Sequence, residues 1–515
     1  MTEVATPTAA RPRRAASLGL LVFALVVTIA GFAQVGLARD GSLPTNMFGY
    51  ALAIVALAAV AYFVMQKWTP YADPLLLPLA VLLNGLGLMM IYRIDQTTTA
   101  DFPEEKARFE AANPGVKYVP FGAGSDVMGQ LMWTVLSIGL FIAALIIIKE
   151  VKAFQRYHYT LGAVGLVLLM LPMVPVIGTE LNGARIWIKL GPFSLQPAEF
   201  CKLAFVVFFA AYLVKKRAAL SLVQRKIWLL ELPRSRDLYP ILAFWILTLM
   251  VLAVENDFGT ALLFFGLFVS MIYIATGKAS WVFIGLSLFI GGVLIIYIGA
   301  QLIGIEHINQ RVEIWLSPEN YFGGGCKLPD GTVDNMLDGK PATQAECWEL
   351  GGSYAESDQL MAGLYAMGEG GVLGTGLGQG QPYRTPLAFS DEIFTSLGEE
   401  LGLTGIMALL MLYILLMERG FKVAIATKDE FSKLFAGGVS FVFALQIFVI
   451  TGGVTKLIPF TGLTTPFLSQ GGSSLLANWV LIALLIRLSH EARKPAPVAI
   501  QDEGMTQIVN VGNLR

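Results

Sequence analysis

Two acidic residues lie two positions apart between apolar blocks that are each long enough to cross a membrane. Glu255 and Asp257 belong to the segment Glu-Asn-Asp-Phe-Gly-Thr, which ends at Thr260. Carboxylates at the edge of a membrane are costly to desolvate, so they usually serve a function. Burial and the neighbouring charge would both raise the pKa of an acid here, which suits a general base. The alternative is an interfacial loop in which water solvates both acids.

A second candidate segment combines basic, acidic and aromatic side chains. Arg185 and Trp187 lie in a polar stretch, and Glu199 and Lys202 open the next apolar block. Glu199 and Lys202 are three residues apart, so they share one face of a helix and can pair. A buried Lys or Arg that faces a cavity is a natural ligand for phosphate oxygens, and Trp187 can lie at the interface or stack on a sugar. The alternative for Glu199 and Lys202 is a structural ion pair inside the membrane.

Two glycine-rich segments offer backbone amides. The run from Gly368 to Gly380 does not fit the dinucleotide-binding pattern G-x-G-x-x-G, because Gln379 stands where its last glycine should be. We interpret this run as a flexible or re-entrant loop near the site. The segment 464–474 opens the last apolar block, and its backbone amides could bind an anion. Its candidate binding residues are Ser469, Gly471, Gly472 and Ser473.

Cysteine and histidine form no zinc-binding or catalytic pattern. Cys201 lies in an apolar block, whereas Cys326 and Cys347 flank a polar insert. The sequence has neither CxxC nor HExxH, and its three histidines lie far apart. We therefore assign no metal ligands.

The composition excludes most other classes of protein. Of the 515 residues, 55% are hydrophobic and 14% charged, with a mean hydropathy of +0.65. Soluble domains carry roughly 25% charged residues, so a soluble multidomain enzyme is excluded. The net charge of -1 argues against a nucleic-acid partner, which requires a basic excess. The fold class is therefore an all-α polytopic membrane protein embedded in a lipid bilayer.

Twelve apolar blocks are long enough to span about 30 Å of hydrocarbon. They cover residues 18–37, 47–66, 74–92, 129–148, 159–177, 198–214, 238–256, 259–276, 280–300, 391–417, 434–452 and 472–489. An even number of spans puts both termini on one side of the membrane.

The basic residues predict the orientation. Arg11, Arg13 and Arg14 precede the first block, and 23 of the 36 Lys and Arg residues fall on the same side as these three. Both termini should therefore be cytoplasmic. The basic cluster in 215–237 is either a positive-inside loop or an amphipathic helix on the inner leaflet. Chemistry is expected in the exported segments, which are 93–128, 178–198, 301–390 and 453–471.

Cys326 and Cys347 both fall in the exported segment 301–390. An oxidising environment favours a disulfide between them, and we predict this bond. Free thiols are the alternative, because the sequence does not give the separation of the two Cα atoms.

Seven segments, in order along the chain, resemble motifs of the SEDS family of cell-wall proteins, which includes RodA, FtsW and SpoVE. The resemblance runs from about Gln130 to Ser489. It rests on NGARIWI, QPAEFCKLA, ENDFGT, Gln310-Arg311, GLGQG, GEELGLTG and PFLSQGGSS. The extra N-terminal spans and the segment 453–460 favour RodA over FtsW.

The resemblance implies a peptidoglycan glycosyltransferase that polymerises lipid II into glycan strands on the outer face of the bacterial cell membrane, during cell elongation and shape maintenance. The catalytic aspartate of the family falls on Asp257, and its conserved Glu and Lys fall on Glu199 and Lys202. The stretch before GEELG lacks the usual Glu and His of the family, so only Asp391 is retained there. Asn256 stands where the family usually has proline.

The implied reaction joins a sugar that carries a polyprenyl diphosphate to an acceptor hydroxyl, with inversion. We expect Asp257 to be the general base, and Arg185 and Lys202 to stabilise the departing diphosphate. Trp187, Gln310, Arg311 and Asp391 complete the set of candidate substrate-binding residues. No tightly bound cofactor is needed, although nearby carboxylates could hold a divalent cation such as Mg²⁺ or Mn²⁺.

Two other functions fit the same sequence. A flippase for the lipid-linked precursor would also have about twelve spans, but it needs charges near the middle of the membrane. The candidate charges here lie near the exported boundary instead. An FtsW-like division protein is the other alternative.

No exported segment is large enough for a transpeptidase or carries its S-x-x-K and K-T-G signatures. Cross-linking of the glycan must then come from a class B penicillin-binding protein as partner. The predicted parts of the chain are a cytoplasmic tail (1–17), N-terminal helices with an exported loop (18–128), a catalytic membrane core (129–489) and a second cytoplasmic tail (490–515).

Overall fold

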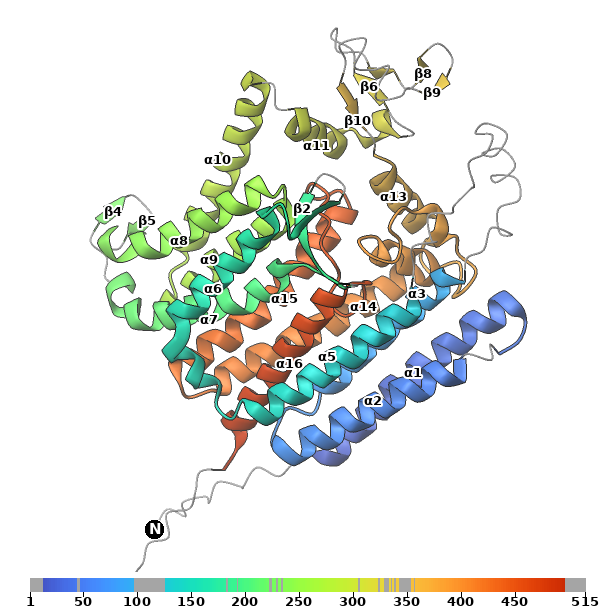
Figure 1. The fold of residues 1–515 in the computed structure, drawn as a ribbon, viewed down its shortest axis with the longest axis horizontal. Coiled ribbons are helices and arrows are strands. Elements are labelled where there is room, and N and C mark those ends of the chain that lie inside the picture. The colour runs from blue at the N-terminus through green and yellow to red at the C-terminus, as the bar shows by residue number, and fades with distance from the viewer. Residues whose placement is uncertain are drawn as a thin grey trace, which may run out of the picture.

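The computed structural model describes residues 13–43, 47–96, 126–181, 184–191, 193–221, 225–227, 230–232, 235–303, 306–322, 325–327, 333–334, 336–337, 340–341, 353–355 and 357–495. Most of these residues are helical (Figure 1). The longer helices are α1 (Arg14–Asp40), α2 (Met47–Trp68), α3 (Leu76–Asp95), α5 (Val127–Ile147), α6 (His158–Met170), α7 (Pro197–Ser221), α8 (Ser235–Val254), α9 (Phe258–Thr276), α10 (Ser280–Ile303), α11 (Glu306–Leu316), α13 (Asp358–Gly370), α14 (Ile393–Ala426), α15 (Glu430–Val454) and α16 (Gly472–Arg493).

Each of the twelve predicted spans falls on a helix. Within the described residues, nine helices are long and apolar enough to cross a membrane, and α8 and α10 contain shorter apolar stretches. The prediction of a polytopic all-α membrane protein is therefore confirmed.

Two spans differ from their predicted extent. The predicted span 159–177 is too long for one helix, because α6 ends at Met170 and gives way to the short 3-10 helix η4 (Leu171–Met173). Pro172 and Pro175 explain this end, since proline cannot donate a backbone hydrogen bond to a continuing helix. The predicted span 391–417 is longer in the structure and is broken at Gly402, whose φ of 67° and ψ of -173° are not helical.

Regular structure also occurs in segments expected to be loops. The segment 178–198 contains the antiparallel sheet β1 (Gly178–Leu181), β2 (Ala184–Leu190) and β3 (Phe193–Leu195), and the segment 301–390 contains α11 and α13. The basic segment 215–237 is not an amphipathic helix on its own. Its first residues continue α7, and a small hairpin of β4 (Arg225–Ile227) and β5 (Leu230–Leu232) follows.

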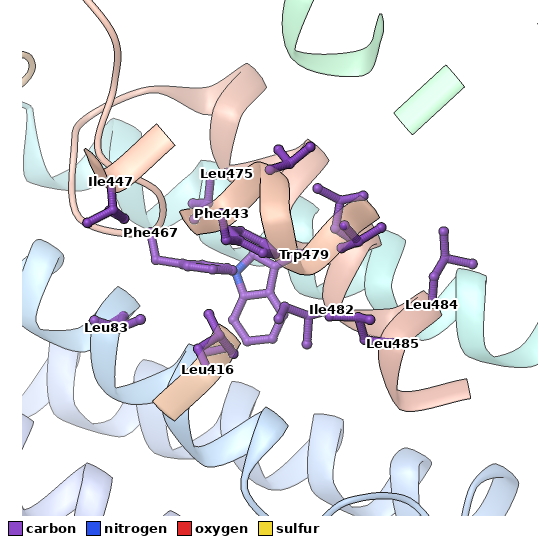
Figure 2. Packing of buried hydrophobic residues seen from close by; sticks show 14 of the residues in the cluster. Leu83, Leu416, Phe443, Ile447, Phe467, Leu475, Trp479, Ile482, Leu484 and Leu485 are labelled. Carbon is purple, nitrogen blue, oxygen red and sulfur yellow. The ribbon is translucent and has the colours of Figure 1, made fainter. Parts of the chain in front are cut away.

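Trp479 of α16 lies at the centre of the buried core. Figure 2 shows its indole among Leu83, Leu416, Phe443, Phe467 and Ile482, which come from several helices. The indole Nε1 donates a hydrogen bond to Asn84 Oδ1 of α3 at 3.0 Å, which satisfies the polar atom of this buried ring. The core therefore ties the N-terminal helices to the last one.

The two ends of the bundle have different characters. The start of α1 and the end of α16 lie on the same side, away from β2, α11 and α13 (Figure 1). At the first end, the side chain of Arg493 bonds to the buried Asp73 at 2.5 Å, and Arg487 donates to the carbonyl of Trp68 at 3.1 Å. The polar segments that connect the helices at the second end form the candidate site.

Candidate active site

A cleft of about 440 Å³ opens between segments that are far apart in the sequence. Its walls come from β2, the turn between α8 and α9, α11, the start of α13, the segment before α14, and the connection between α15 and α16. The lining residues are Ala184, Ile186, Trp187, Gln196, Asn256, Asp257, Phe258, Gly259, Arg311, Ile314, Trp315, Ser357, Gln359, Leu360, Leu387, Ser390, Asp391, Pro459, Phe460, Thr461, Gly462, Thr464 and Gln470. Four predicted site residues thus meet: Trp187, Asp257, Arg311 and Asp391.

Asp257 caps the N-terminus of α9. Its Oδ1 accepts a hydrogen bond from the backbone N–H of Thr260 at 2.9 Å, whereas its buried Oδ2 has no hydrogen-bond partner among the described residues. The preceding Asn256 has a φ of 60°, a left-handed conformation that asparagine tolerates better than most side chains. Proline could not adopt this φ, so the turn differs in form from one with the family's usual proline.

The predicted rise in pKa at this turn is confirmed. Burial, and then the charge of Asp257, raise the pKa of Glu255 to about 8. Burial also raises the pKa of Asp257, against the lowering effect of the Thr260 hydrogen bonds. Both acids are almost completely inaccessible to solvent, with exposed fractions of 2% and 9%. The turn therefore holds carboxyl groups that accept a proton more readily than ordinary acids do.

Asp391 is the second carboxyl of the cleft. It lies two residues before α14, and Ser390 Oγ donates to its Oδ1 at 3.2 Å. Burial raises its pKa to about 6, and the charge of Asp257 contributes to this rise. The two aspartates are therefore close enough to influence each other's ionisation.

The segment 459–471 holds the cleft together through hydrogen bonds. Ser469 Oγ donates to the carbonyl of Ser390 at 2.7 Å, and the N–H of Gln470 donates to the carbonyl of Phe389 at 2.9 Å. The N–H of Gly471 donates to Gln130 Oε1 at 3.2 Å. The expectation that these backbone amides bind an anion is therefore wrong for Gln470 and Gly471, because both donate within the protein.

Gly472 and Ser473 lie behind the cleft and are not among its lining residues. A Cβ on Gly472 would lie 2.2 Å from the ring of Trp133, so this glycine allows close packing. Ser473 Oγ accepts a hydrogen bond from the N–H of Gln196 at 2.9 Å. Both residues support the walls of the cleft.

The predicted basic and aromatic residues are partly assembled. Arg311 stacks over the ring of Phe258, with its guanidinium 5.0 Å from the ring centre. Trp187 lines the cleft, but its neighbour Arg185 is exposed and is not among the lining residues. Gln310 belongs to α11, and its side chain lies outside the described part of the structure.

Glu199 and Lys202 lie inside the bundle and do not line the cleft. Lys202 Nζ is 2.6 Å from Glu199 Oε2, and it also donates to Gln446 Oε1 at 3.0 Å. Both side chains are almost completely buried. These contacts support the alternative interpretation, a structural ion pair.

The glycine-rich run is not a loop beside the cleft. It packs against the first half of α14: the N–H of Gly376 donates to the carbonyl of Glu400 at 3.0 Å, and the N–H of Gly378 donates to Glu400 Oε2 at 2.9 Å. Arg93 of α3 completes this arrangement, with its Nε 2.8 Å from Glu400 Oε1 and its Nη2 2.7 Å from the carbonyl of Gly380. We call these contacts the Arg93–Glu400 clamp.

Sequence reasoning missed several residues that shape the site. Arg93 and Gln446 are isolated polar residues in or at the end of an apolar block, and a polar residue at membrane depth is a signal for a specific partner. Trp315 lines the cleft, and its Nε1 donates to the carbonyl of Lys456 at 3.2 Å. No pattern in the sequence singled out this tryptophan.

Two predictions are not tested by the structure. Cys347 lies outside the described residues, so its disulfide with Cys326 stays a prediction. Within the residues that the structure describes, no three side chains of His, Cys, Asp or Glu come together as metal ligands.

Comparison with known proteins gives consistent matches. The family model FTSW_RODA_SPOVE, described as "Cell cycle protein", matches residues 73–330 and 345–494. Peptidoglycan glycosyltransferase RodA of Mycobacterium tuberculosis is 41% identical over 499 residues, which is 96% of this chain and 95% of that protein. The RodA of Mycobacterium leprae is 40% identical over 94% of this chain and 92% of its own length.

More distant proteins share the fold. Stage V sporulation protein E of Bacillus subtilis is 29% identical over 83% of this chain and 99% of its own length. A chain from a solved peptidoglycan synthase complex, described as coordinating polymerization and crosslinking, matches with a TM-score of 0.55 and 21% identity. The match covers 82% of this chain and 99% of that one.

Proposed function

This chain belongs to the FtsW, RodA and SpoVE family, and we propose that it is a peptidoglycan glycosyltransferase that polymerises lipid II into glycan strands during cell elongation and shape maintenance. The observation that carries this proposal is the 41% identity to a protein named peptidoglycan glycosyltransferase RodA, over almost the full length of both chains. The cleft supports it, because it combines two carboxyl groups of raised pKa with a basic and several aromatic side chains.

We propose that an aspartate in the cleft removes the proton from the acceptor hydroxyl, with Asp257 as the first candidate. A base of raised pKa is suited to this step, and burial raises the pKa of Asp257. Attack on the sugar carbon from the side opposite the diphosphate then inverts its configuration. The free Oδ2 of Asp257 is the oxygen available to accept the proton, since Oδ1 caps α9.

Asp391 is the second candidate for the base. Its pKa of about 6 lies closer to the working pH than that of an ordinary aspartate, and its carboxyl group caps no helix. Brønsted behaviour favours a base whose pKa is near the ambient pH. The matched variants Asp257→Asn and Asp391→Asn separate the two roles, because only the base is irreplaceable by an amide that keeps its hydrogen bonds.

Arg311 is the cation best placed for the departing diphosphate. It lines the cleft and its charge acts on Asp257, whereas Arg185 lies on β2 between the lining residues Ala184 and Ile186. Positive charge directed at the leaving group stabilises the transition state. Lys202 then contributes through its ion pair with Glu199 rather than by contact with the diphosphate.

The reaction needs no tightly bound cofactor in this proposal. Mg²⁺ is usually held by one or two carboxylates together with substrate phosphates, and Asp391 beside Asp257 offers such a place. A cation there would neutralise charge on the diphosphate. Removal of divalent cations with EDTA tests whether the reaction requires one.

We also propose the orientation and the partner. The cleft lies on the exported side, the two termini lie in the cytoplasm, and the lipid tail of the substrate lies among the helices. The excess of Lys and Arg at the end of the bundle opposite the cleft supports this orientation. A class B penicillin-binding protein would supply the cross-linking activity, which fits the likeness in fold to a chain of a peptidoglycan synthase complex.

The test is polymerisation of labelled lipid II by the purified protein without ATP. Glycan strands should form with wild type and disappear with Asp257→Asn or Asp391→Asn. Glu430→Gln, at an exposed acid on α15 that is paired with Arg217, is the matched control and should keep full activity. Transfer of lipid II across a vesicle membrane without any polymer would favour a flippase instead.

A further inference from the structure

A buried amide side chain in α15 connects the interior of the bundle to the wall of the cleft. Gln446 is fully buried. Its Oε1 accepts a hydrogen bond from Lys202 Nζ at 3.0 Å, and its Nε2 donates to the carbonyl of Thr464 at 2.8 Å. Lys202 in turn pairs with Glu199 at 2.6 Å. Three consecutive polar contacts therefore join α7, α15 and the segment that contains Thr464.

That segment separates the two aspartates of the cleft. A Cβ on Gly462 would lie 3.3 Å from Asp391 Oδ2. A Cβ on Gly259, two residues after Asp257, would lie 2.9 Å from Leu463 Cγ and 3.1 Å from Thr461 Cβ. A shift of residues 461–464 would therefore be felt by both carboxyl groups.

Residues 459–465 form neither helix nor strand, so their position depends on individual contacts. The carbonyl of Thr464 needs a donor at this depth, because a buried carbonyl without one is costly. A primary amide is suited to this place, since it accepts from the ammonium group and donates to the carbonyl at the same time.

We propose that Gln446 is a positioning residue for the reaction: it ties the Glu199–Lys202 pair to the carbonyl of Thr464 and so fixes the wall that lies between Asp257 and Asp391. This inference rests on the proposed glycosyltransferase function, and it adds a role that the motifs of the chain do not assign. Misplacement of reacting groups by about 1 Å can slow a reaction roughly 100-fold, so loss of this contact should reduce the rate of the chemical step.

Two variants separate positioning from simple stability. Gln446→Leu keeps a similar volume but removes both hydrogen bonds, and we expect kcat to fall about tenfold or more while KM changes by less than about threefold. Gln446→Glu keeps the shape, but only a protonated Glu can donate to the carbonyl of Thr464. Its activity relative to wild type should therefore rise as the pH falls from 8 to 6. A purely structural role would not produce this pH dependence.

Ser440→Ala is the matched control. Ser440 is buried in the same helix, and its Oγ donates only within the helix, to the carbonyl of Ala436 at 2.7 Å. This variant should keep the wild-type kcat and KM, although it also loses a buried hydrogen bond. Full activity of Gln446→Leu, or a relative activity of Gln446→Glu that does not change with pH, would overturn the inference.

Hydrogen–deuterium exchange gives a readout that does not depend on polymerisation. Residues 461–470 should exchange faster in Gln446→Leu than in wild type or Ser440→Ala, whereas α16 should be unchanged. Unchanged exchange in this segment overturns the inference even if activity is lost. If wild type makes no polymer, the proposed function fails, and the exchange experiment still decides whether Gln446 holds the wall.

Discussion

Asp257 in the cleft and Glu400 in the Arg93–Glu400 clamp are both buried acids, but their oxygens are bonded differently. Both oxygens of Glu400 accept hydrogen bonds, from Arg93 and from the N–H of Gly378. Only one oxygen of Asp257 does so, and the other has no partner among the described residues. A fully bonded buried charge contributes to the fold, whereas an incompletely bonded one is available for chemistry.

The comparison also separates the two glycine-containing regions around these acids. In the clamp, the backbone of the glycine-rich run is tied to α14 by hydrogen bonds at residues 375, 376 and 378. In the cleft, Gly462 and Gly259 bring the backbone close to side chains and leave an open space beside them. We expect changes in the clamp to affect stability first and changes in the cleft to affect catalysis first.

The largest effect should come from the aspartates. Asp257→Asn or Asp391→Asn, whichever removes the base, should lower the polymerisation rate about 100-fold to 10,000-fold, because general base catalysis contributes on this scale. The thermal unfolding temperature should stay close to that of wild type. The rate is measured with labelled lipid II. Polymer at the wild-type rate from both variants would remove the cleft from the mechanism.

Breaking the clamp should mainly destabilise the fold. Arg93→Met leaves Glu400 as an unpaired buried charge and should lower the free energy of unfolding by about 3–5 kcal/mol. The double variant Arg93→Met/Glu400→Gln should recover part of this loss, because the unpaired charge is gone. Thermal unfolding in detergent measures both.

A matched surface pair controls for this experiment. Lys152 pairs with Asp429 at 2.8 Å, but the Lys152 side chain is 60% exposed. Lys152→Met should therefore cost less than about 1 kcal/mol. A similar loss for Arg93→Met and Lys152→Met would show that the clamp adds no stability beyond a surface pair.

A smaller effect is expected at the cation of the cleft. Arg311→Gln should lower transition-state stabilisation by about 2–4 kcal/mol, because it removes positive charge aimed at the leaving diphosphate. Lys189→Gln, an exposed cation on β2, should leave the rate unchanged. Measurement of kcat/KM for both variants decides the point, and equal rates would remove Arg311 from the site.

The smallest effect is the response of wild type to pH. If Asp391 is the base, it works only when ionised, and its pKa is about 6. The rate should be constant at higher pH and should fall up to tenfold per pH unit as the pH drops below about 6. Initial rates in a buffer series from pH 5 to 8 measure this, with thermal unfolding at each pH as the control. A flat profile would assign the base to a group that titrates elsewhere.

The sequence predicted the helices and the residues with strong local patterns. Apolar blocks located the spans because a membrane demands about 20 apolar residues for each crossing. Asp257, Trp187, Arg311 and Asp391 were recognised from their motifs, and the structure brings all four to one cleft.

The contacts that hold the cleft could not be predicted in the same way. Lys202 and Gln446 are 244 positions apart, and Gln130 and Ser469 are 339 positions apart. Such partners are set by how the helices pack, which no local pattern encodes. The sheet β1–β3 was missed for a different reason, since its strands have only three to seven residues.

The 307 positions between Arg93 and Glu400 also set an order of events during biosynthesis. At 5–20 residues per second, the ribosome makes Arg93 about 15–60 s before its partner. Throughout this interval the guanidinium group must remain in contact with water or with the lipid headgroups, because its buried position has no counter-charge yet. The end of α3 can therefore settle into its final place only after α14 has entered the membrane. Membrane insertion of the first three helices is thus completed by a segment made near the end of translation.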